Sequence, residues 1–185
     1  EIDWNDRLIG IKGTRGVGKT TFLLQYTKEK FGATDRRCLY VNMNNFYFQS
    51  KGIAEFAGEF VSRGGEVLLI DQEFKQPNWS KELRLCYDRY PQLKIIFTGS
   101  SVMRLKEENP ELNNIVKSYN LRGFSFREFL NLRTGKTFHA YTLDDILQQH
   151  EHIAKEILQT TPPLEYFKEY LHHGFYPFFL EHRNF

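Results

Sequence analysis

The segment GTRGVGKT, residues 13–20, constrains the fold of this 185-residue chain more than any other feature. It matches the pattern G-x-x-x-x-G-K-[S/T] in full, and that pattern needs a strand before it and a helix after it. Backbone N–H groups around Gly16 and Gly18 turn inward to surround phosphate oxygens, which leaves no room for side chains and requires positive φ at some positions. The positive end of the helix dipole then points at the phosphates.

The same segment gives its polar side chains defined roles. Lys19 offers a point charge to the β- and γ-phosphates of a nucleotide, and the hydroxyl of Thr20 can coordinate Mg²⁺. A full match arises by chance in about one chain of this length in a hundred, and the expected flanking strand and helix lower that figure. The sequence therefore predicts binding of ATP or ADP with Mg²⁺, with nucleotide contacts at Gly13, Thr14, Arg15, Gly16, Val17, Gly18, Lys19, Thr20 and Thr21.

Strand-like and helix-like patterns alternate through the first two thirds of the chain. Short apolar runs predict strands at residues 7–12, 38–41, 67–70 and 93–97, with a weaker one at 117–121. Between them, apolar residues at helical spacing from Ile53 to Val61 predict a helix. Gly32 is expected to end the helix after the motif, and Ser80 to cap a later one. This alternation predicts an α/β fold, with a mainly parallel sheet flanked by helices on both faces.

The final third of the sequence carries helix signals and no strand signal. Ser125 and Glu128 form a capping-box pair, Thr142 can cap a longer helix, and the Pro162-Pro163 pair interrupts the helical pattern. We therefore expect an α/β core over residues 1–123 and a helical lid, or the start of a C-terminal region, over residues 124–185. The last residues, PFFLEHRNF, are strongly apolar. This predicts a fragment whose aromatic end packs on a missing domain, on the lid or on another subunit.

The run VLLIDQEFK, residues 67–75, reads as a buried strand that ends in an acid. In phosphate-loop proteins the acid at the end of such a strand holds Mg²⁺, usually through water, and supports the hydroxyl residue of the loop. Asp71 and Thr20 are therefore the predicted metal residues. An aspartate that merely terminates a strand is the alternative interpretation.

The residues after Asp71 decide the expected chemistry. A glutamate directly after it can orient or deprotonate the attacking water, but Gln72 cannot accept a proton at neutral pH, and loss of a general base typically costs ~10²–10⁴-fold in rate. If the strand continues, Glu73 points to the opposite face, so it can act only where the backbone turns sharply. The candidate catalytic residues are Lys19, Gln72 and Glu73, with an exposed loop acid as the alternative for Glu73.

Polar residues also follow the strand predicted at 93–97, in the segment TGSS. The end of a strand beside the phosphate loop lies near the nucleotide, so Thr98 or Ser100 can sense the γ-phosphate. A Gly-Ser turn that caps the next helix explains the same segment equally well. Both residues are therefore candidates for nucleotide binding, and both interpretations stay open.

Beyond these motifs, the chain resembles bacterial AAA-type ATPases of a small family of predicted ATPases from archaea and bacteria. The resemblance covers nearly the whole chain and rests on GTRGVGKTT, the acid strand followed by PNWSKEL, KIIFTGSS, LRGFSFREFLNL and YLHHGFYPFFLE. It implies a five-stranded core in which the strand at 93–97 lies between the phosphate-loop strand and the acid strand. It also implies ATP hydrolysis, a helical lid from residue 124, and a further C-terminal domain.

Two positions depart from that family's pattern. Its members usually have Asp-Glu where this chain has Asp71-Gln72, and they tend to have arginines where this chain has Asn114 and Ile115. Such arginines can stabilise developing charge on phosphate, a contribution of up to ~10³–10⁵ in other NTPases. We therefore expect a nucleotide-dependent switch domain whose hydrolysis is slow or impaired. The alternatives are an active ATPase that uses Glu73 or a partner subunit, a small-molecule kinase, and a nucleic-acid-associated regulator that binds through a missing C-terminal domain.

Composition narrows the expected partners and location. The formal net charge of +2 is too small to indicate nucleic acid binding by this part of the protein. Cys38 and Cys86 lie far apart without metal-ligand spacing, which favours reduced intracellular thiols. No apolar run approaches the ~18–20 residues of a membrane span. We therefore expect a cytoplasmic protein that binds nucleotide and makes no membrane contact.

Overall fold

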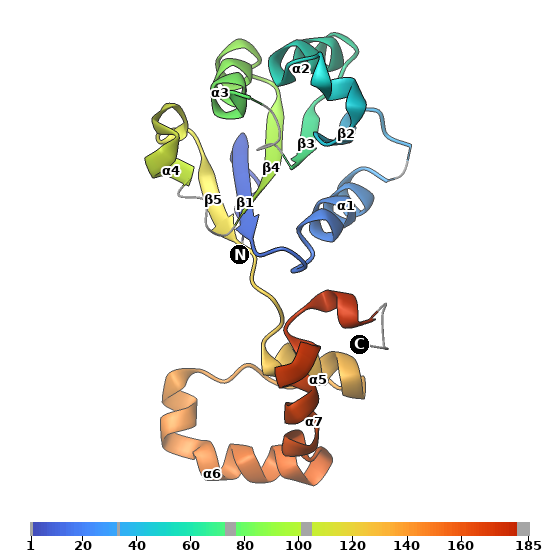
Figure 1. Cartoon of the computed structure of the whole chain (residues 1–185). Coiled ribbons are helices and arrows are strands. Elements are labelled where there is room, and N and C mark those ends of the chain that lie inside the picture. Colours follow the sequence, from blue (N-terminus) through green and yellow to red (C-terminus); the bar gives the residue numbers. More distant parts are fainter. Residues whose placement is uncertain (1, 33, 73–76, 101–104, 181–185) are drawn as a thin grey trace. The chain divides into compact units, whose positions relative to one another are not determined.

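Five short strands form one parallel sheet in the computed structural model of the chain (Figure 1). They are β1 (Leu8–Gly13), β2 (Cys38–Asn42), β3 (Val67–Asp71), β4 (Lys94–Ser100) and β5 (Lys117–Asn120). Their order across the sheet is β2-β3-β4-β1-β5, and every adjacent pair is parallel. The predicted α/β fold is therefore confirmed, including the place of β4 between the phosphate-loop strand β1 and the acid strand β3.

The structure describes residues 2–32, 34–72, 77–100 and 105–180, and only the backbone at 49, 100, 105 and 106. By their internal contacts the residues fall into two units, Glu1–Arg122 and Gly123–Phe185. The first unit contains the sheet and its helices, and the described part of the second is helical. No helix within these described residues is long and apolar enough to cross a membrane.

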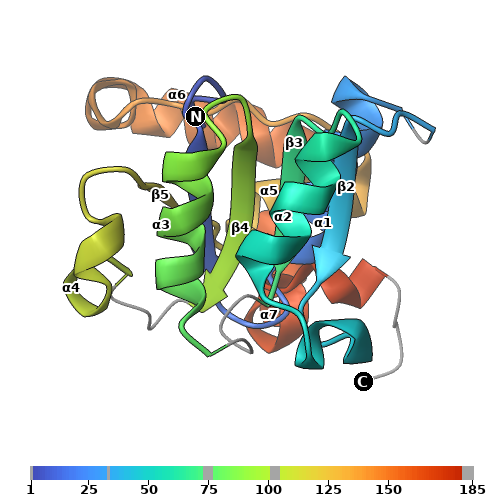
Figure 2. The ribbon, with the colours of Figure 1, turned by 90° about the horizontal axis from the view of Figure 1, so that it is seen from above.

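Alternation along the strands gives the sheet two apolar faces. On one face Leu8, Ile70 and Phe97 belong to a core shared with α2 (Ile53–Ser62) and α3 (Trp79–Arg89). On the other face Ile9, Leu69 and Ile96 belong to a core shared with α1 (Lys19–Lys30). Figure 2 shows α2 and α3 on one side of the strands and α1 on the other. Burial on both faces explains why the inner strands are continuous apolar runs.

The helix boundaries follow the sequence signals at most positions. Gly32 has φ +77° directly after the end of α1, as expected of a glycine that terminates a helix. The expectation for Ser80 was wrong, because α3 begins at Trp79 and Ser80 lies inside its first turn. Trp79 packs its ring on Phe97, with 5.8 Å between ring centroids, and the buried Ser80 donates its hydroxyl to the carboxylate of Glu111. Asn78 holds the N-cap position of α3 instead, and its side chain makes no capping hydrogen bond.

Short helices complete the described part of the first unit: η1 (Phe46–Gln49), α4 (Leu105–Glu108) and η3 (Pro110–Leu112). The second unit contains α5 (Phe126–Thr134), α6 (Leu143–Thr160), α7 (Pro163–Glu169), the π-helix η4 (Tyr170–Gly174) and η5 (Pro177–Leu180). Ser125 with Glu128 and Thr142 with Asp145 form capping boxes at α5 and α6, which confirms both predicted helix starts. The fully buried ring of Phe129 lies among the aromatic rings of the second unit, namely Phe126, Tyr170 and Phe179.

The α2–α3 face of the sheet provides a direct stability test at Phe97, which is 0% exposed. We predict that Phe97→Ala lowers the free energy of unfolding by about 3–5 kcal/mol, because it removes a buried ring and leaves a cavity under Trp79. Denaturant unfolding would measure the change. Phe46→Ala removes the same ring from a side chain that is 80% exposed, so its effect should stay within about 0.5 kcal/mol. Equal effects of the two substitutions would contradict this assignment of the core.

Candidate functional site

Strand alternation and the start of α1 bring four polar side chains together at the carboxyl ends of the inner strands. Asp71 ends β3 two residues after Leu69, and Thr98 lies on β4 two residues after Ile96, so both side chains point to the face that carries α1. Tyr40 on the neighbouring strand β2 packs against the same face. Thr20, in the first turn of α1, completes the group.

The carboxylate of Asp71 is the centre of this group and is only 3% exposed. Its Oδ1 accepts a hydrogen bond from Thr98 Oγ1 at 2.6 Å. Its Oδ2 accepts two, from Thr20 Oγ1 at 2.7 Å and from the Tyr40 hydroxyl at 2.8 Å. Hydrogen bonds from several donors offset the large free-energy cost of burying a carboxylate. We call these four residues, Thr20, Tyr40, Asp71 and Thr98, the acid cluster.

Tyr40 is the member of the acid cluster that sequence analysis missed. Burial, and then its hydrogen bond to Asp71, raise the pKa of Tyr40 to about 12, so its hydroxyl is a protonated donor at neutral pH. The parallel register places Tyr40 beside Leu69 and Asn42 beside Asp71. The only sequence feature that could have identified Tyr40 is a tyrosine near the end of an adjacent strand, on the same face as the acid. No motif marks this position.

The phosphate-loop segment has the backbone that its glycines predicted. Gly16 and Gly18 have φ of +88° and +90°. A Cβ on Gly13 would lie 2.5 Å from the carbonyl oxygen of Leu121, so the loop passes too close to the backbone after β5 for any side chain there. Lys19 Nζ donates to the carbonyl oxygens of Gly13 at 2.8 Å and of Thr14 at 2.9 Å. The lysine thus lies folded over its own loop.

Most of the loop is open to a ligand. Val17 is buried and anchors the segment in the fold. The exposed residues of the predicted nucleotide site are Thr14, Arg15, Gly16, Thr20 and Thr21. The first turn of α1 contains no acidic residue, and no side chain caps its N-terminus within the described part of the chain. Backbone N–H groups at the start of α1 are therefore available to an anion.

The chain turns directly after Asp71. Strand β3 ends at that residue, and Gln72 has φ +59°, a conformation uncommon for residues other than glycine. The backbone N–H of Gln72 donates to Thr98 Oγ1 at 3.2 Å, so one hydroxyl holds both the acid and the turn. Glu73 lies outside the described residues, so its catalytic role stays a prediction.

The second predicted polar segment, at the end of β4, is only partly joined to the acid cluster. Thr98 is buried and its hydroxyl already has partners in Asp71 and Gln72. The backbone of Ser100 pairs with Gly13 of the phosphate loop. Ser100 therefore lies at the carboxyl ends of the strands, where the acid cluster also lies. The side chain of Ser100 lies outside what the structure describes. Its contact with a nucleotide therefore stays a prediction.

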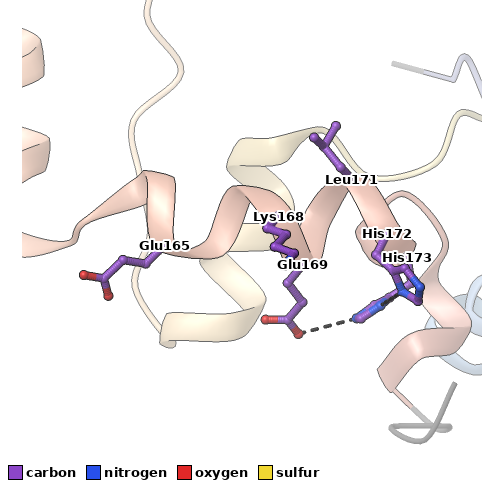
Figure 3. Close-up of a pocket in the computed structure, with 6 residues that line it drawn as sticks. All are labelled: Glu165, Lys168, Glu169, Leu171, His172 and His173. Carbon is purple, nitrogen blue, oxygen red and sulfur yellow. Dashed lines mark hydrogen bonds and ion pairs between the residues drawn. The ribbon is translucent and has the colours of Figure 1, made fainter.

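A separate pocket of about 600 Å³ lies in the second unit (Figure 3). Glu169 on its wall forms ion-pair contacts with Arg133 at 3.0 Å and with His173 at 3.4 Å, the latter when His173 is protonated. The pocket is open, and it contains none of the catalytic, nucleotide-binding or metal residues predicted from the sequence. Its lining residues are Glu165, Lys168, Glu169, Leu171, His172 and His173. We place the candidate site at the acid cluster and phosphate loop instead, because buried polar groups and an uncapped helix start converge there.

Comparison with known proteins identifies the family of the chain. A family model described as AAA domain matches residues 5–130 of the chain. Among solved structures, the chain is similar to the Orc1 protein of Aeropyrum pernix in complex with DNA, with a TM-score of 0.45 and 14% sequence identity. The match covers 82% of this chain and 50% of that one, so this chain spans about half its length. No curated protein matches the sequence.

The close approach at Gly13 gives a prediction that needs no ligand. Gly13→Ala should lower the free energy of unfolding by more than Gly32→Ala, because its methyl group meets the Leu121 backbone, which cannot rotate away. Gly32 has a positive φ and open space around it, so Gly32→Ala should cost only the conformational strain of about 1–2 kcal/mol. Urea unfolding of both variants measures the difference. A Gly13→Ala protein as stable as Gly32→Ala would contradict the described loop geometry.

Proposed function

Because the chain belongs to the AAA domain family and is a nucleotide-binding AAA-type domain, we propose that it is an ATP- and Mg²⁺-dependent switch that hydrolyses ATP slowly. The observation that carries this proposal is the 2.7 Å hydrogen bond from Thr20 to Asp71. It joins the phosphate loop to the acid strand in the arrangement that a metal-bound nucleotide needs. The residue after that acid is an amide, Gln72, which has no proton-accepting group for the attacking water.

The loop from Gly13 to Thr21 suits the phosphates of a nucleotide. Positive φ at Gly16 and Gly18 supports a concave loop whose backbone N–H groups face an anion. The uncapped start of α1 adds the positive end of a helix dipole. On nucleotide binding, the Lys19 ammonium group would leave the carbonyl oxygens of Gly13 and Thr14 and donate to phosphate oxygens instead.

The same cluster suits Mg²⁺, with Thr20 as a ligand and Asp71 holding the metal through water. Magnesium usually binds through one or two carboxylates together with substrate phosphates, and it keeps several waters. Bound Mg²⁺ would neutralise charge on the β- and γ-phosphates. Thr20 would bind the metal through its oxygen while its hydroxyl proton remains directed at Asp71.

Slow hydrolysis is proposed from the residues at the two places where the chain departs from the family pattern. Gln72 can hydrogen-bond a water molecule but cannot remove its proton at neutral pH. At the positions where relatives tend to carry arginines, Asn114 is an exposed amide and Ile115 packs against the α2–α3 core. Neither side chain can stabilise developing negative charge as a guanidinium does. Binding and hydrolysis are therefore separated in this proposal.

Thr98 is assigned to the site through Asp71. Its hydroxyl donates to the carboxylate and accepts from the backbone of Gln72, so a direct bond to a γ-phosphate would require it to give up Asp71. Ser100, whose backbone lies beside Gly13, is the better placed of the two for direct contact. Thr98 instead fixes the orientation of the metal acid and the turn that follows it.

A second candidate, an active ATPase, is favoured by the turn at Gln72. Its positive φ redirects the chain after β3, which meets the condition that Glu73 needs in order to leave the strand's alternation. A glutamate turned toward the nucleotide would supply the missing proton acceptor. Hydrolysis by the wild-type chain at about 1 s⁻¹ or faster would favour this candidate over the switch, since enzymes typically turn over at about 1–10³ s⁻¹.

The proposed partners beyond nucleotide concern the second unit. We propose that a nucleotide-dependent change reaches a further C-terminal domain, or a second copy of the chain, through the aromatic segment Phe175–Leu180. This segment includes the partly exposed rings of Phe175 and Phe178. Aromatic side chains are enriched where proteins associate. We propose a cytoplasmic location on the basis of two free cysteines, Cys38 and Cys86.

Nucleotide binding is tested by ligand-dependent thermal stability. We predict that ATP with Mg²⁺ raises the melting temperature of the wild-type chain, because a ligand at 100 times its Kd stabilises the folded state by about 2.7 kcal/mol. Lys19→Ala should lose most of that increase. Lys30→Ala changes an exposed lysine at the other end of the same helix and should keep it. An increase that is absent from the wild type, or equal in Lys19→Ala, would contradict the proposed site.

The hydrolysis part of the proposal is tested at Gln72. Gln72→Glu should increase the rate of phosphate release by about 10²-fold or more, since it restores a proton acceptor next to the metal acid. Steady-state phosphate release at saturating ATP measures the rate. The companion variant Glu73→Ala separates the two candidate functions. It should leave the wild-type rate unchanged if the chain is a slow switch, and should abolish turnover if Glu73 is the base.

A further inference from the structure

Tyr40 makes a contact that neither the phosphate loop nor the acid strand requires. Its hydroxyl donates to Asp71 Oδ2 at 2.8 Å, the same oxygen that accepts from Thr20 at 2.7 Å. Tyr40 belongs to β2, which is an edge strand of the sheet, whereas Thr20 belongs to α1. One carboxylate oxygen therefore joins the outer strand to the predicted metal residue of the loop.

Three donors fix the orientation of the Asp71 carboxylate. An aspartate side chain rotates easily about its last torsion, because that torsion has broad minima. Thr98 holds Oδ1 from β4, while Thr20 and Tyr40 hold Oδ2 from two other elements. When Thr20 binds a metal through its oxygen, Tyr40 is the donor to Oδ2 that remains outside the metal's own ligands.

Strand pairing sets the position of Tyr40. The parallel register places Tyr40 beside Leu69 and Asn42 beside Asp71. In the turn after β2, the Oδ1 atom of Asn42 accepts the backbone N–H of Asn44 at 2.9 Å.

We propose that Tyr40 is a positioning residue that orients Asp71 for the metal and thereby sets the Mg²⁺ dependence of nucleotide binding. This inference rests on the proposed function, because it needs a nucleotide and a metal at the acid cluster. Residues that hydrogen-bond metal-binding carboxylates typically change metal affinity about 10–100-fold when they are mutated. Tyr40 acts through Asp71 and has no assigned contact with the phosphates.

The competing explanation is that Tyr40 is only a packing residue. Its ring does pack against the core on the α1 face of the sheet. Tyr40→Phe keeps that ring and removes only the hydroxyl, so it separates packing from positioning. Tyr119→Phe is the matched control. Tyr119 lies on the other edge strand, packs against the same core, and accepts a hydrogen bond from the backbone of Asp3 instead of donating to Asp71.

The experiment measures binding of a fluorescent ADP analogue to the whole chain during a Mg²⁺ titration and, separately, in EDTA. We expect Tyr40→Phe to raise the Mg²⁺ concentration at half-maximal enhancement by about tenfold or more, with unchanged affinity in EDTA. Tyr119→Phe should match the wild type in both conditions. The split between the two conditions matters, because a general loss of packing would weaken binding in both.

Each other outcome overturns a defined statement. A Tyr40→Phe chain with unchanged or tighter Mg²⁺ dependence would remove the positioning role while leaving the proposed function intact. Equal losses with Mg²⁺ and in EDTA would make Tyr40 a packing residue. A wild-type chain that binds no nucleotide in either condition would overturn the proposed function itself, and the assignment of Tyr40 with it.

Discussion

The buried carboxylate of Asp71 is the constraint on which the rest of the candidate site depends. An acid that is 3% exposed needs hydrogen-bond donors, and here they come from α1, β2 and β4. The parallel sheet places the ends of β2, β3 and β4 at one edge, and the phosphate loop places Thr20 over that edge. The Asp71 carboxylate therefore receives all its hydrogen bonds only when α1, β2, β3 and β4 are correctly placed relative to one another. Gly13 extends the same dependence to β5 through its close approach to Leu121.

Much of this arrangement was predictable because it is local in sequence. The motif GTRGVGKT predicts a strand before it and a helix after it, and the apolar runs predict which residues form β1, β3 and β4. Alternation within a strand also assigns the face to which Asp71 points. Tyr40 was not predictable in this way, because its role depends on the register between β2 and β3, which no local pattern encodes. The prediction for Ser80 was wrong because Asn78 takes the N-cap position of α3, while the Ser80 hydroxyl bonds to Glu111, which is distant in sequence.

The backbone at the end of β3 does not continue as the regular strand that the sequence pattern implied. Alternation in a continuing strand points Glu73 away from the site, but the strand ends at Asp71 and Gln72 has a positive φ. Thr98 stabilises that turn by accepting the N–H of Gln72 while it donates to Asp71. The hydroxyl of Thr98, one of the two candidates for phosphate sensing, is thus already shared between the acid and the turn. The proposed separation of nucleotide binding from hydrolysis depends on these few residues.

The central claim is that Thr20 and Asp71, held by Tyr40 and Thr98, receive the metal of a nucleotide bound to the phosphate loop. A crystal structure of the chain with a non-hydrolysable ATP analogue and Mg²⁺ tests it most directly. The account predicts Lys19 on the phosphates, the metal between the phosphates and Thr20, and Asp71 beyond it with its bond to Tyr40 retained. A nucleotide bound elsewhere, or a metal with Asp71 turned away from it, would contradict the account.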